Sequence, residues 1–340
     1  MNNILVIKLR YIGDVLLATP TLQAIKTAYP AARLTMLVNR GTEEVLLGNP
    51  HLDQIMVLEK GSLVAQWRFV SDLRRRRFDT VIDLTDADRS AFLSLISGAG
   101  VRIGFNDEGR LRGRSYTAVV PTQTVVRHRI ERDLAAIELL GIGPAGKTPG
   151  IWLSPEEQEA ADRLLMRLGV RIDQPLAVLQ PGARYWFKAW PADRFAELAD
   201  RLASEHGCQV LIGGSRQEED LAHRIHQAAK SRPVSFAGQA TLKQFAGIVK
   251  RAGLFVGNDS GAMHIATAVG TPVVALFGPS NPAEWGPRGG TVEVIYKGLD
   301  CRACFHPTCD RGEQNCMKLI TVDEVMTAVG RAMKNAGIGM

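Results

Sequence analysis

An aspartate that follows the first apolar segment could carry out acid–base chemistry. The run Asn3–Leu9 has the length of a buried strand, and Gly13-Asp14 stands shortly after it, at the start of a helix. A carboxylate there can serve as a catalytic base or contact a ligand, because the glycine beside it allows close approach. The alternative is structural, since aspartate is a preferred N-cap residue.

Two cations lie in a loop that follows a later apolar run. The loop 180–191 comes after the strand-like segment Leu176–Gln180 and contains Arg184 and Lys188. Positive side chains at a strand end suit a diphosphate, because their hydrogen bonds to phosphate oxygens are charge-assisted. An ordinary loop with surface cations is the alternative.

The most informative motif joins an aspartate to a helix start that is rich in small residues. Asp259 ends a strand, Ser260 and Gly261 open a helix, and His264 lies one turn further on. Free backbone N–H groups and the helix dipole make such a start a natural phosphate site. The alternative is an Asp/Ser cap with a histidine that is satisfied in the core.

An acidic helix start stands after another glycine turn. Gly213-Gly214 leads into a first helical turn that contains Glu218 and Glu219. Either these carboxylates only complement the helix dipole, or one of them holds the hydroxyls of a ribose.

Four cysteines raise the question of a metal. Cys301, Cys304, Cys309 and Cys316 are enough thiols for a tetrahedral zinc site, but their spacing is not the usual pattern of paired knuckles. We expect a local structural element outside the chemistry. The D-x-D sequence Asp86–Asp88, a metal-binding form in some sugar-nucleotide enzymes, is too short to carry weight. No phosphate-binding P-loop is present and no G-x-G-x-x-G follows the first strand, so kinase, GTPase and simple NAD-dependent functions lose their main support.

These motifs are positioned by alternating strand and helix patterns. Such alternation predicts parallel sheets that are covered on both faces, with ligands bound at the carboxyl ends of the strands. Residues 141–153 are rich in Gly and Pro and lack periodicity, which indicates a linker. We therefore expect an α/β protein with a first doubly wound, Rossmann-like domain over residues 1–150, a second over 151–320 and a final helical segment over 321–340. The cleft between the two domains is the predicted active site.

The individual elements follow from the same patterns. The expected strands are Asn3–Leu9, Leu34–Asn39, Asp53–Glu59, Thr80–Leu84, Val101–Phe105, Leu176–Gln180, Gln209–Ile212, Val234–Ala237, Leu254–Gly257 and Val273–Phe277. The expected helical regions are Asp14–Tyr29, Ser62–Arg75, Glu131–Leu140, Ser154–Leu168, Pro191–Glu205, Gln217–Ala229, the segment after Asp259, and Val322–Lys334.

Charge is unevenly distributed along the chain. The 340 residues are 46% hydrophobic and carry a net charge of +6, an ordinary globular composition. Residues 1–150 hold 20 Lys and Arg against 15 Asp and Glu, whereas the remainder holds 21 against 20. A basic first domain suits an anionic partner, either a membrane surface, a phosphorylated glycan or a nucleic acid, and the alternative is an ordinary solvated helix face. The aromatic interleaving typical of single-stranded nucleic-acid binding is missing. Polar or breaker residues interrupt each long apolar segment, so we expect no signal peptide, no membrane span and a cytoplasmic protein.

The motifs together are similar to those of a known family. They are Lys8 with Gly13-Asp14 and Thr19-Pro20, then Lys188-x-Trp190-Pro191, Asn258-Asp259-Ser260-Gly261-x-x-His264-Ile265-Ala266 and Phe277-Gly278-Pro279, in this order along nearly the whole chain. This set resembles the ADP-heptose:lipopolysaccharide heptosyltransferases, glycosyltransferase family nine. Leu84–Asp86 and the loop 180–188 are most similar to the heptosyltransferase III branch, which adds a side-branch heptose to the inner core.

The resemblance implies a GT-B architecture, with the acceptor on the first domain, the donor nucleotide on the second, and a last helix that often returns to the first domain. It implies an inverting, metal-independent transfer without a cofactor, in which Asp14 deprotonates the acceptor hydroxyl. The implied donor-binding residues are Lys188, Arg184, Asp259, Ser260, Gly261 and His264, and Glu218, with Glu219 as the alternative to it for the ribose. The implied acceptor-binding residues are Lys8, Arg10 and Gly13.

The implied partners are ADP-heptose and a lipid-linked core acceptor at the inner face of the inner membrane. No amphipathic anchor helix is evident, so we expect the basic first domain to attach peripherally, by charge. The sequence leaves open a transferase or epimerase of the same architecture that uses another nucleotide sugar. A nucleotide-sugar-binding module without turnover is a third possibility.

Overall fold

The computed structural model describes residues 1–59, 61–121, 127–301 and 309–337. The chain divides into two units, Met1–Trp152 and Leu153–Met340, and the sequence-based boundary at residue 150 falls just before this division. Among the described residues, no helix combines the length and the apolar character needed to cross a bilayer.

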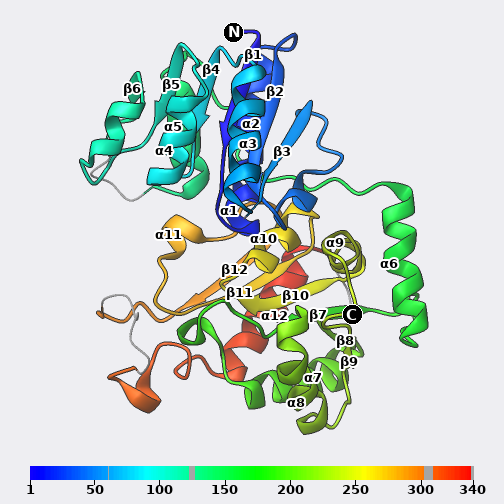
Figure 1. Ribbon diagram of the computed structural model, residues 1–340. Helices are drawn as coiled ribbons and strands as arrows, with labels where there is room; N and C mark the ends of the chain where they lie inside the picture. Colours follow the sequence, from blue (N-terminus) through cyan, green and yellow to red (C-terminus); the bar gives the residue numbers. More distant parts are fainter. Residues whose placement is uncertain (60, 122–126, 302–308, 338–340) are drawn as a thin grey trace. The chain divides into compact units, whose positions relative to one another are not determined.

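Unit 1 is built on a six-stranded parallel sheet (Figure 1). The sheet order is β3-β2-β1-β4-β5-β6, with strands β1 (Asn3–Ile7), β2 (Arg33–Asn39), β3 (Gln54–Leu58), β4 (Thr80–Asp83), β5 (Val101–Gly104) and β6 (Ala118–Val119). Its helices are α1 (Ile12–Leu17), α2 (Thr19–Ala28), α3 (Leu63–Arg75), α4 (Asp88–Ile96) and α5 (Arg129–Glu138), with the 3₁₀ turns η1 (Glu43–Leu46) and η2 (Leu111–Ser115). The central strands are continuous apolar runs because helices cover both faces of the sheet.

Unit 2 repeats this plan (Figure 1). Its sheet order is β12-β11-β10-β7-β8-β9, with β7 (Leu176–Gln180), β8 (Gln209–Ile212), β9 (Val234–Ser235), β10 (Leu254–Asn258), β11 (Val273–Phe277) and β12 (Val292–Tyr296). Its helices are α6 (Pro155–Arg167), α7 (Ala192–His206), α8 (Glu219–Ala228), α9 (Leu242–Arg251), α10 (Gly261–Ala268), α11 (Pro282–Trp285) and α12 (Val322–Asn335), with the 3₁₀ turns η3 (Trp186–Lys188), η4 (Arg216–Glu218) and η5 (Gly312–Gln314).

Both sheets have the strand order of a doubly wound Rossmann fold, which confirms the predicted fold class. Read in chain order within each unit, the order is 3-2-1-4-5-6. Ligands bind such sheets where the order reverses, at the carboxyl ends of the first and fourth strands. In unit 1 these are β1 and β4, and in unit 2 they are β7 and β10. The loops after these four strands are therefore where chemistry is expected.

The helical region expected over Asp14–Tyr29 is divided into α1 and α2. Pro20 has no N–H to donate to the carbonyl of Leu16, and the hydroxyl of Thr19 donates to that carbonyl instead, at 2.7 Å. The short helix α1 therefore ends soon after Asp14. The structure also contains β6, β12, α4, α9 and α11 where the sequence patterns had predicted no element.

The last helix packs within unit 2. Residues such as Val325 and Val329 of α12 lie in one apolar core with residues of β7, β10 and α7. The resemblance had suggested a terminal segment that returns to the first domain, whereas this helix completes one face of the second sheet. Its apolar stripe, capped by Thr321, accounts for that position.

Candidate active site

Asp14 lies in the first turn of α1, just beyond the carboxyl end of β1. The N-cap position is occupied by Tyr11, whose side chain makes no capping hydrogen bond, so Asp14 is not the helix cap. Tyr11 has a φ of 36°, a conformation that is strained for a residue with a side chain. The structure therefore disfavours the structural alternative for Asp14 and places its half-buried carboxylate at the edge where ligands bind.

The surroundings of Asp14 make it a stronger base than an exposed aspartate. Burial raises the pKa of Asp14, and the positive charge of Lys8 opposes that rise. The carboxylate of Asp133 raises the pKa further, whereas Arg129 lowers it. The net pKa of Asp14 lies above its ordinary value, so this carboxylate binds a proton more readily than a solvated one.

Lys8 is a buried partner of α5 rather than an exposed ligand. Its Nζ lies 2.7 Å and 2.9 Å from the two carboxylate oxygens of Asp133 and donates to the carbonyl of Leu84 at 3.0 Å. These three bonds use all the ammonium donors. With 5% of Lys8 exposed, the predicted direct contact with an acceptor does not fit its position, whereas its charge acts on Asp14. Arg10 is exposed and Gly13 is half-buried, and their contacts with an acceptor stay predictions.

The neighbouring strand end carries an ion-pair network that the sequence analysis missed. Asp86, with φ of 57°, binds Arg112 at 2.7 Å and Arg132 at 2.6 Å. Arg132 also lies 3.7 Å from the centroid of the Phe105 ring. The first carboxylate of the D-x-D sequence is thus paired with arginines. Among the described residues, no group of His, Cys, Asp or Glu side chains is arranged to hold a metal ion.

In unit 2, Lys188 and Asp259 form an ion pair at the switch point. The Lys188 Nζ lies 2.6 Å from the Asp259 Oδ2, which joins the loop after β7 to the end of β10. Asn258 fixes the same loop, because its side chain accepts from the Trp190 N–H at 3.1 Å and donates to the Pro181 carbonyl at 2.8 Å. Asn258 and Asp259, adjacent in the chain, therefore hold the cationic loop in place.

The start of α10 offers donors of the kind that bind phosphate. Ser260 is the N-cap, makes no side-chain capping bond, and its buried hydroxyl has no hydrogen-bond partner within the described residues. Asp259 was expected to be able to cap this helix, but its carboxylate pairs with Lys188 instead. Gly261 is half-buried, and His264 is buried one turn further on. Backbone N–H groups and a hydroxyl thus converge beside one cation.

The two candidate ribose carboxylates have different environments. Glu218 is half-buried and accepts from the Ser215 N–H at 2.7 Å, and an added Cβ on Gly182 would lie 1.7 Å from its Oε1. Glu218 thus lies against the loop that carries Lys188. Arg184, on that same loop, is exposed beside the ring of Tyr185.

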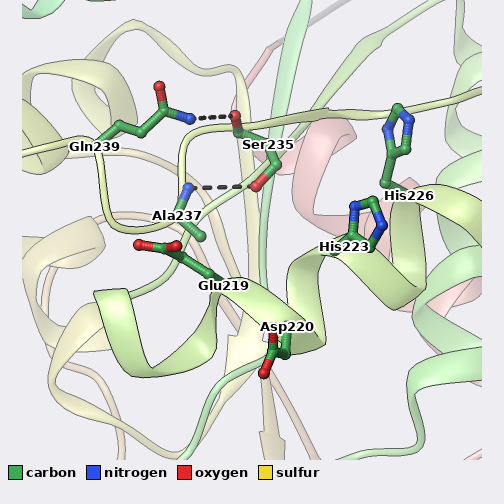
Figure 2. A pocket seen from close by; sticks show the side chains of 7 residues that line it. All are labelled: Glu219, Asp220, His223, His226, Ser235, Ala237 and Gln239. Carbon is green, nitrogen blue, oxygen red and sulfur yellow. Dashed lines mark hydrogen bonds between the residues drawn. The ribbon is translucent and has the colours of Figure 1, made fainter.

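Glu219 faces a separate pocket of about 470 Å³ between α8 and the segment after β9. Figure 2 shows Glu219 on the side of Ala237, with His223 and His226 further along the helix. Ser235 lines the same pocket and its hydroxyl accepts from the Ala237 N–H at 3.3 Å. The side chains that line this pocket are mostly polar.

Three of the four clustered cysteines lie among the described residues. Cys316 is buried in the apolar core of unit 2, Cys309 is half-buried and Cys301 is exposed. Cys304 falls outside the described residues. The expectation of a structural element separate from the chemistry remains a prediction.

Comparisons of the sequence and of the fold with known proteins agree on one family of proteins. A family model for glycosyltransferase family 9 (heptosyltransferase) matches residues 66–314. Lipopolysaccharide heptosyltransferase 3 of Escherichia coli is 29% identical over 97% of this chain and 99% of its own. The protein of the same name from E. coli strain K12 is 31% identical over 96% of each chain. The solved structure of E. coli ADP-heptose lps heptosyltransferase II has the same fold, with a TM-score of 0.82, 23% identity and coverage of 99% of this chain and 100% of that one.

Proposed function

The chain belongs to glycosyltransferase family 9, the heptosyltransferases, and we propose that it moves a heptose from ADP-heptose to the inner core of lipopolysaccharide with Asp14 as general base. The names of its relatives support this donor and acceptor, and favour the heptosyltransferase III branch. Its two Rossmann-like units have the GT-B fold. The observation that carries the mechanism is the half-buried carboxylate of Asp14, with its raised pKa, at the carboxyl end of β1.

The first part of the reaction is proton removal from the acceptor. A sugar hydroxyl is a poor nucleophile at neutral pH, so its proton passes to the Asp14 carboxylate as its oxygen bonds to the anomeric carbon. Burial raises the pKa of Asp14, so the carboxylate accepts this proton more readily. Gly13, which has no side chain, leaves room for the acceptor, and exposed Arg10 is placed to meet its negative groups.

The second part is departure of ADP. The bond between the anomeric carbon and the phosphate oxygen breaks with its electron pair on ADP, on the face opposite to attack, which inverts the configuration. Lys188 meets the negative charge that builds on the diphosphate, and the N–H groups at the start of α10 bind the same phosphates. The carboxylate of Asp259, at 2.6 Å, holds the lysine in position for this task.

The remaining donor contacts follow from the same loop. Glu218 lies against Gly182, which belongs to the same loop as Lys188, so we assign ribose binding to Glu218 rather than Glu219. The exposed guanidinium of Arg184 supplies a further cation for the diphosphate, and the hydroxyl of Ser260 a further donor. The buried side chain of His264 stabilises the start of α10.

The acceptor is a lipid-linked, phosphorylated oligosaccharide, so the enzyme works at the inner surface of the inner membrane. The excess of positive charge in residues 1–150 supports attachment to such a surface. The attachment is peripheral in this proposal.

The decisive experiment incubates the protein with ADP-heptose and defined truncated cores, and measures product mass. A gain of one heptose on a core that already carries the main-chain heptoses supports the proposal and the heptosyltransferase III assignment. A gain of one heptose on a shorter core would instead assign the chain to another heptosyltransferase branch. Conversion of the donor without an acceptor would identify an epimerase, and binding of the donor without any product would identify a binding module.

A further inference from the structure

Helix α3 exposes apolar side chains that the described residues of unit 1 do not cover. Leu63, Val64 and Trp67 are 83%, 61% and 76% exposed, and their spacing places them on one side of the first turns of the helix. Only Leu73 of this helix is buried, although Phe69 packs against the core. The helix begins with a Ser62 cap, whose hydroxyl accepts from the Ala65 N–H, so the exposed residues belong to an ordered helix.

The elements next to α3 also expose apolar side chains. Helix α4 contacts α3 and exposes Phe92 and Leu95, and η2 contacts α4 and exposes Leu111. Single exposed apolar residues are normal on a protein surface, whereas several on three adjacent elements indicate an interaction site. We name these six residues the α3–α4 surface.

Arginines accompany the α3–α4 surface. Arg68, Arg74 and Arg75 lie on α3, and Arg89 begins α4; all four are exposed. None of them takes part in an ion pair within the described residues. The acidic residues of the same elements are already paired, since Asp72 binds Arg76 and Asp88 binds Arg112.

We propose that the α3–α4 surface docks unit 1 on an anionic lipid bilayer. Trp67 and its apolar neighbours enter the interfacial region, and the unpaired arginines bind lipid phosphates. This docking surface deepens the proposed function. It rests on that function only in the choice of the inner membrane as the bilayer that is bound. In this proposal the apolar side of α3 adds to the attachment by charge that the sequence analysis expected.

Charge argues for a bilayer rather than a second copy of the chain. In a symmetric dimer the same surface meets itself, so the arginines of one copy would face those of the other. Such an arrangement places like charges together and is unfavourable. An anionic lipid surface complements both the apolar residues and the cations.

The test measures binding of the full chain to vesicles of phosphatidylethanolamine with 30% phosphatidylglycerol, by sedimentation at about 0.1 M and 0.5 M salt. The triple variant Leu63→Ser/Val64→Ser/Trp67→Ser should bind at least about tenfold more weakly at both salt concentrations. Arg68→Gln/Arg74→Gln/Arg75→Gln should lose on the order of fivefold per arginine at low salt and much less at high salt. Met166→Ser, which removes an exposed apolar residue from α6 in unit 2, is the matched control and should bind like the wild type.

Equal vesicle binding by the wild type and by the apolar variant Leu63→Ser/Val64→Ser/Trp67→Ser would overturn the proposal. So would a wild type that dimerises through this surface without lipid dependence, shown by size-exclusion chromatography. Activity on a delipidated core oligosaccharide separates this test from the proposed function, because the docking variants should retain it. Vesicle binding with no transfer to any core would remove the proposed function and leave the docking surface standing.

Discussion

The ammonium of Lys8 and the carboxylate of Asp133 form a buried ion pair, with 2.7 Å between Nζ and Oδ2, and both charges act on the pKa of Asp14. Lys8 extends from β1 and Asp133 from α5, 125 residues apart in the chain. The pair therefore ties the sheet to a covering helix and sets the electrostatic environment of the proposed base. Because the two charges shift the pKa of Asp14 in opposite directions, removing either charge tests the role of the pair.

The first prediction concerns the pH dependence of kcat/KM. Asp133→Asn removes a negative charge that raises the pKa of Asp14, so the acid limb should move to lower pH. Lys8→Met removes a positive charge that lowers this pKa, so the limb should move to higher pH. Each shift should be on the order of 1 pH unit. Both variants will also lose stability, by about 3–5 kcal/mol, because each leaves a buried group without its partner.

Asp53→Asn is the control for a change that affects only stability. Asp53 pairs with Lys26 at 2.8 Å at the amino end of the unit 1 strands, away from Asp14. This variant should lower Tm without moving the pH profile. Shifts of Asp133→Asn and Lys8→Met in the same direction would contradict the electrostatic role of the pair.

The second prediction is that Asp14→Asn separates activity from stability. The amide keeps the shape but cannot accept the proton, so turnover should fall about a hundred- to ten-thousandfold. The folded protein raises the pKa of Asp14, so between the unfolded and folded pKa values the folded state binds more protons and stability falls as pH rises. At neutral pH the ionised carboxylate therefore costs stability, and Asp14→Asn should have an unchanged or higher Tm. Tm, ADP affinity and turnover measured on one preparation decide this, and a lower Tm with normal turnover would make Asp14 a structural residue.

Much of the fold could be predicted because its strands are buried on both faces. Continuous apolar runs such as Leu176–Gln180 and Val273–Phe277 are typical of buried parallel strands at that length. Helix α9 was missed although its signal is present, since Thr241 and Gln244 form a capping box before an apolar stripe. Strand β12 lies at the sheet edge and none of its residues is fully buried, so its side chains carry a weaker pattern.

The candidate site was predictable only in part. Asp259 directly follows β10, and Asp14 and Lys188 stand in the segments that follow β1 and β7, so the doubly wound topology places all three at ligand-binding edges. Asp133 lies within an amphipathic helix and resembles a surface residue in sequence, and nothing local indicates that it meets Lys8. The pairing of Lys188 with Asp259 also depends on two strands that are adjacent in the sheet but distant in the chain.

The third prediction concerns this second ion pair. Lys188→Ala should weaken ADP binding and lower turnover, because the charge that meets the leaving diphosphate is lost. Asp259→Ala should lower kcat/KM for the donor about tenfold, because Lys188 is no longer held in place. The double variant should lose little more than Lys188→Ala alone, since Asp259 acts through the lysine. Additive losses in the double variant would show that Asp259 has a role independent of Lys188. Normal ADP affinity and turnover in Lys188→Ala would show that the donor site lies elsewhere.

The last prediction concerns Gly182 and Glu218. A Cβ on Gly182 would lie 1.7 Å from the Glu218 Oε1, so Gly182→Ala must displace that carboxylate. If Glu218 binds the ribose hydroxyls, both Gly182→Ala and Glu218→Gln should raise the KM for the donor, by about tenfold or more for a hydrogen bond to a charged group. Glu219→Gln, on the neighbouring carboxylate, should leave the KM unchanged. ADP and its 2′,3′-dideoxy analogue provide the direct measurement: the wild type should prefer ADP, and Glu218→Gln should lose that preference. A preference for ADP that survives in Glu218→Gln and disappears in Glu219→Gln would transfer the ribose contact to Glu219 and to the pocket beside α8.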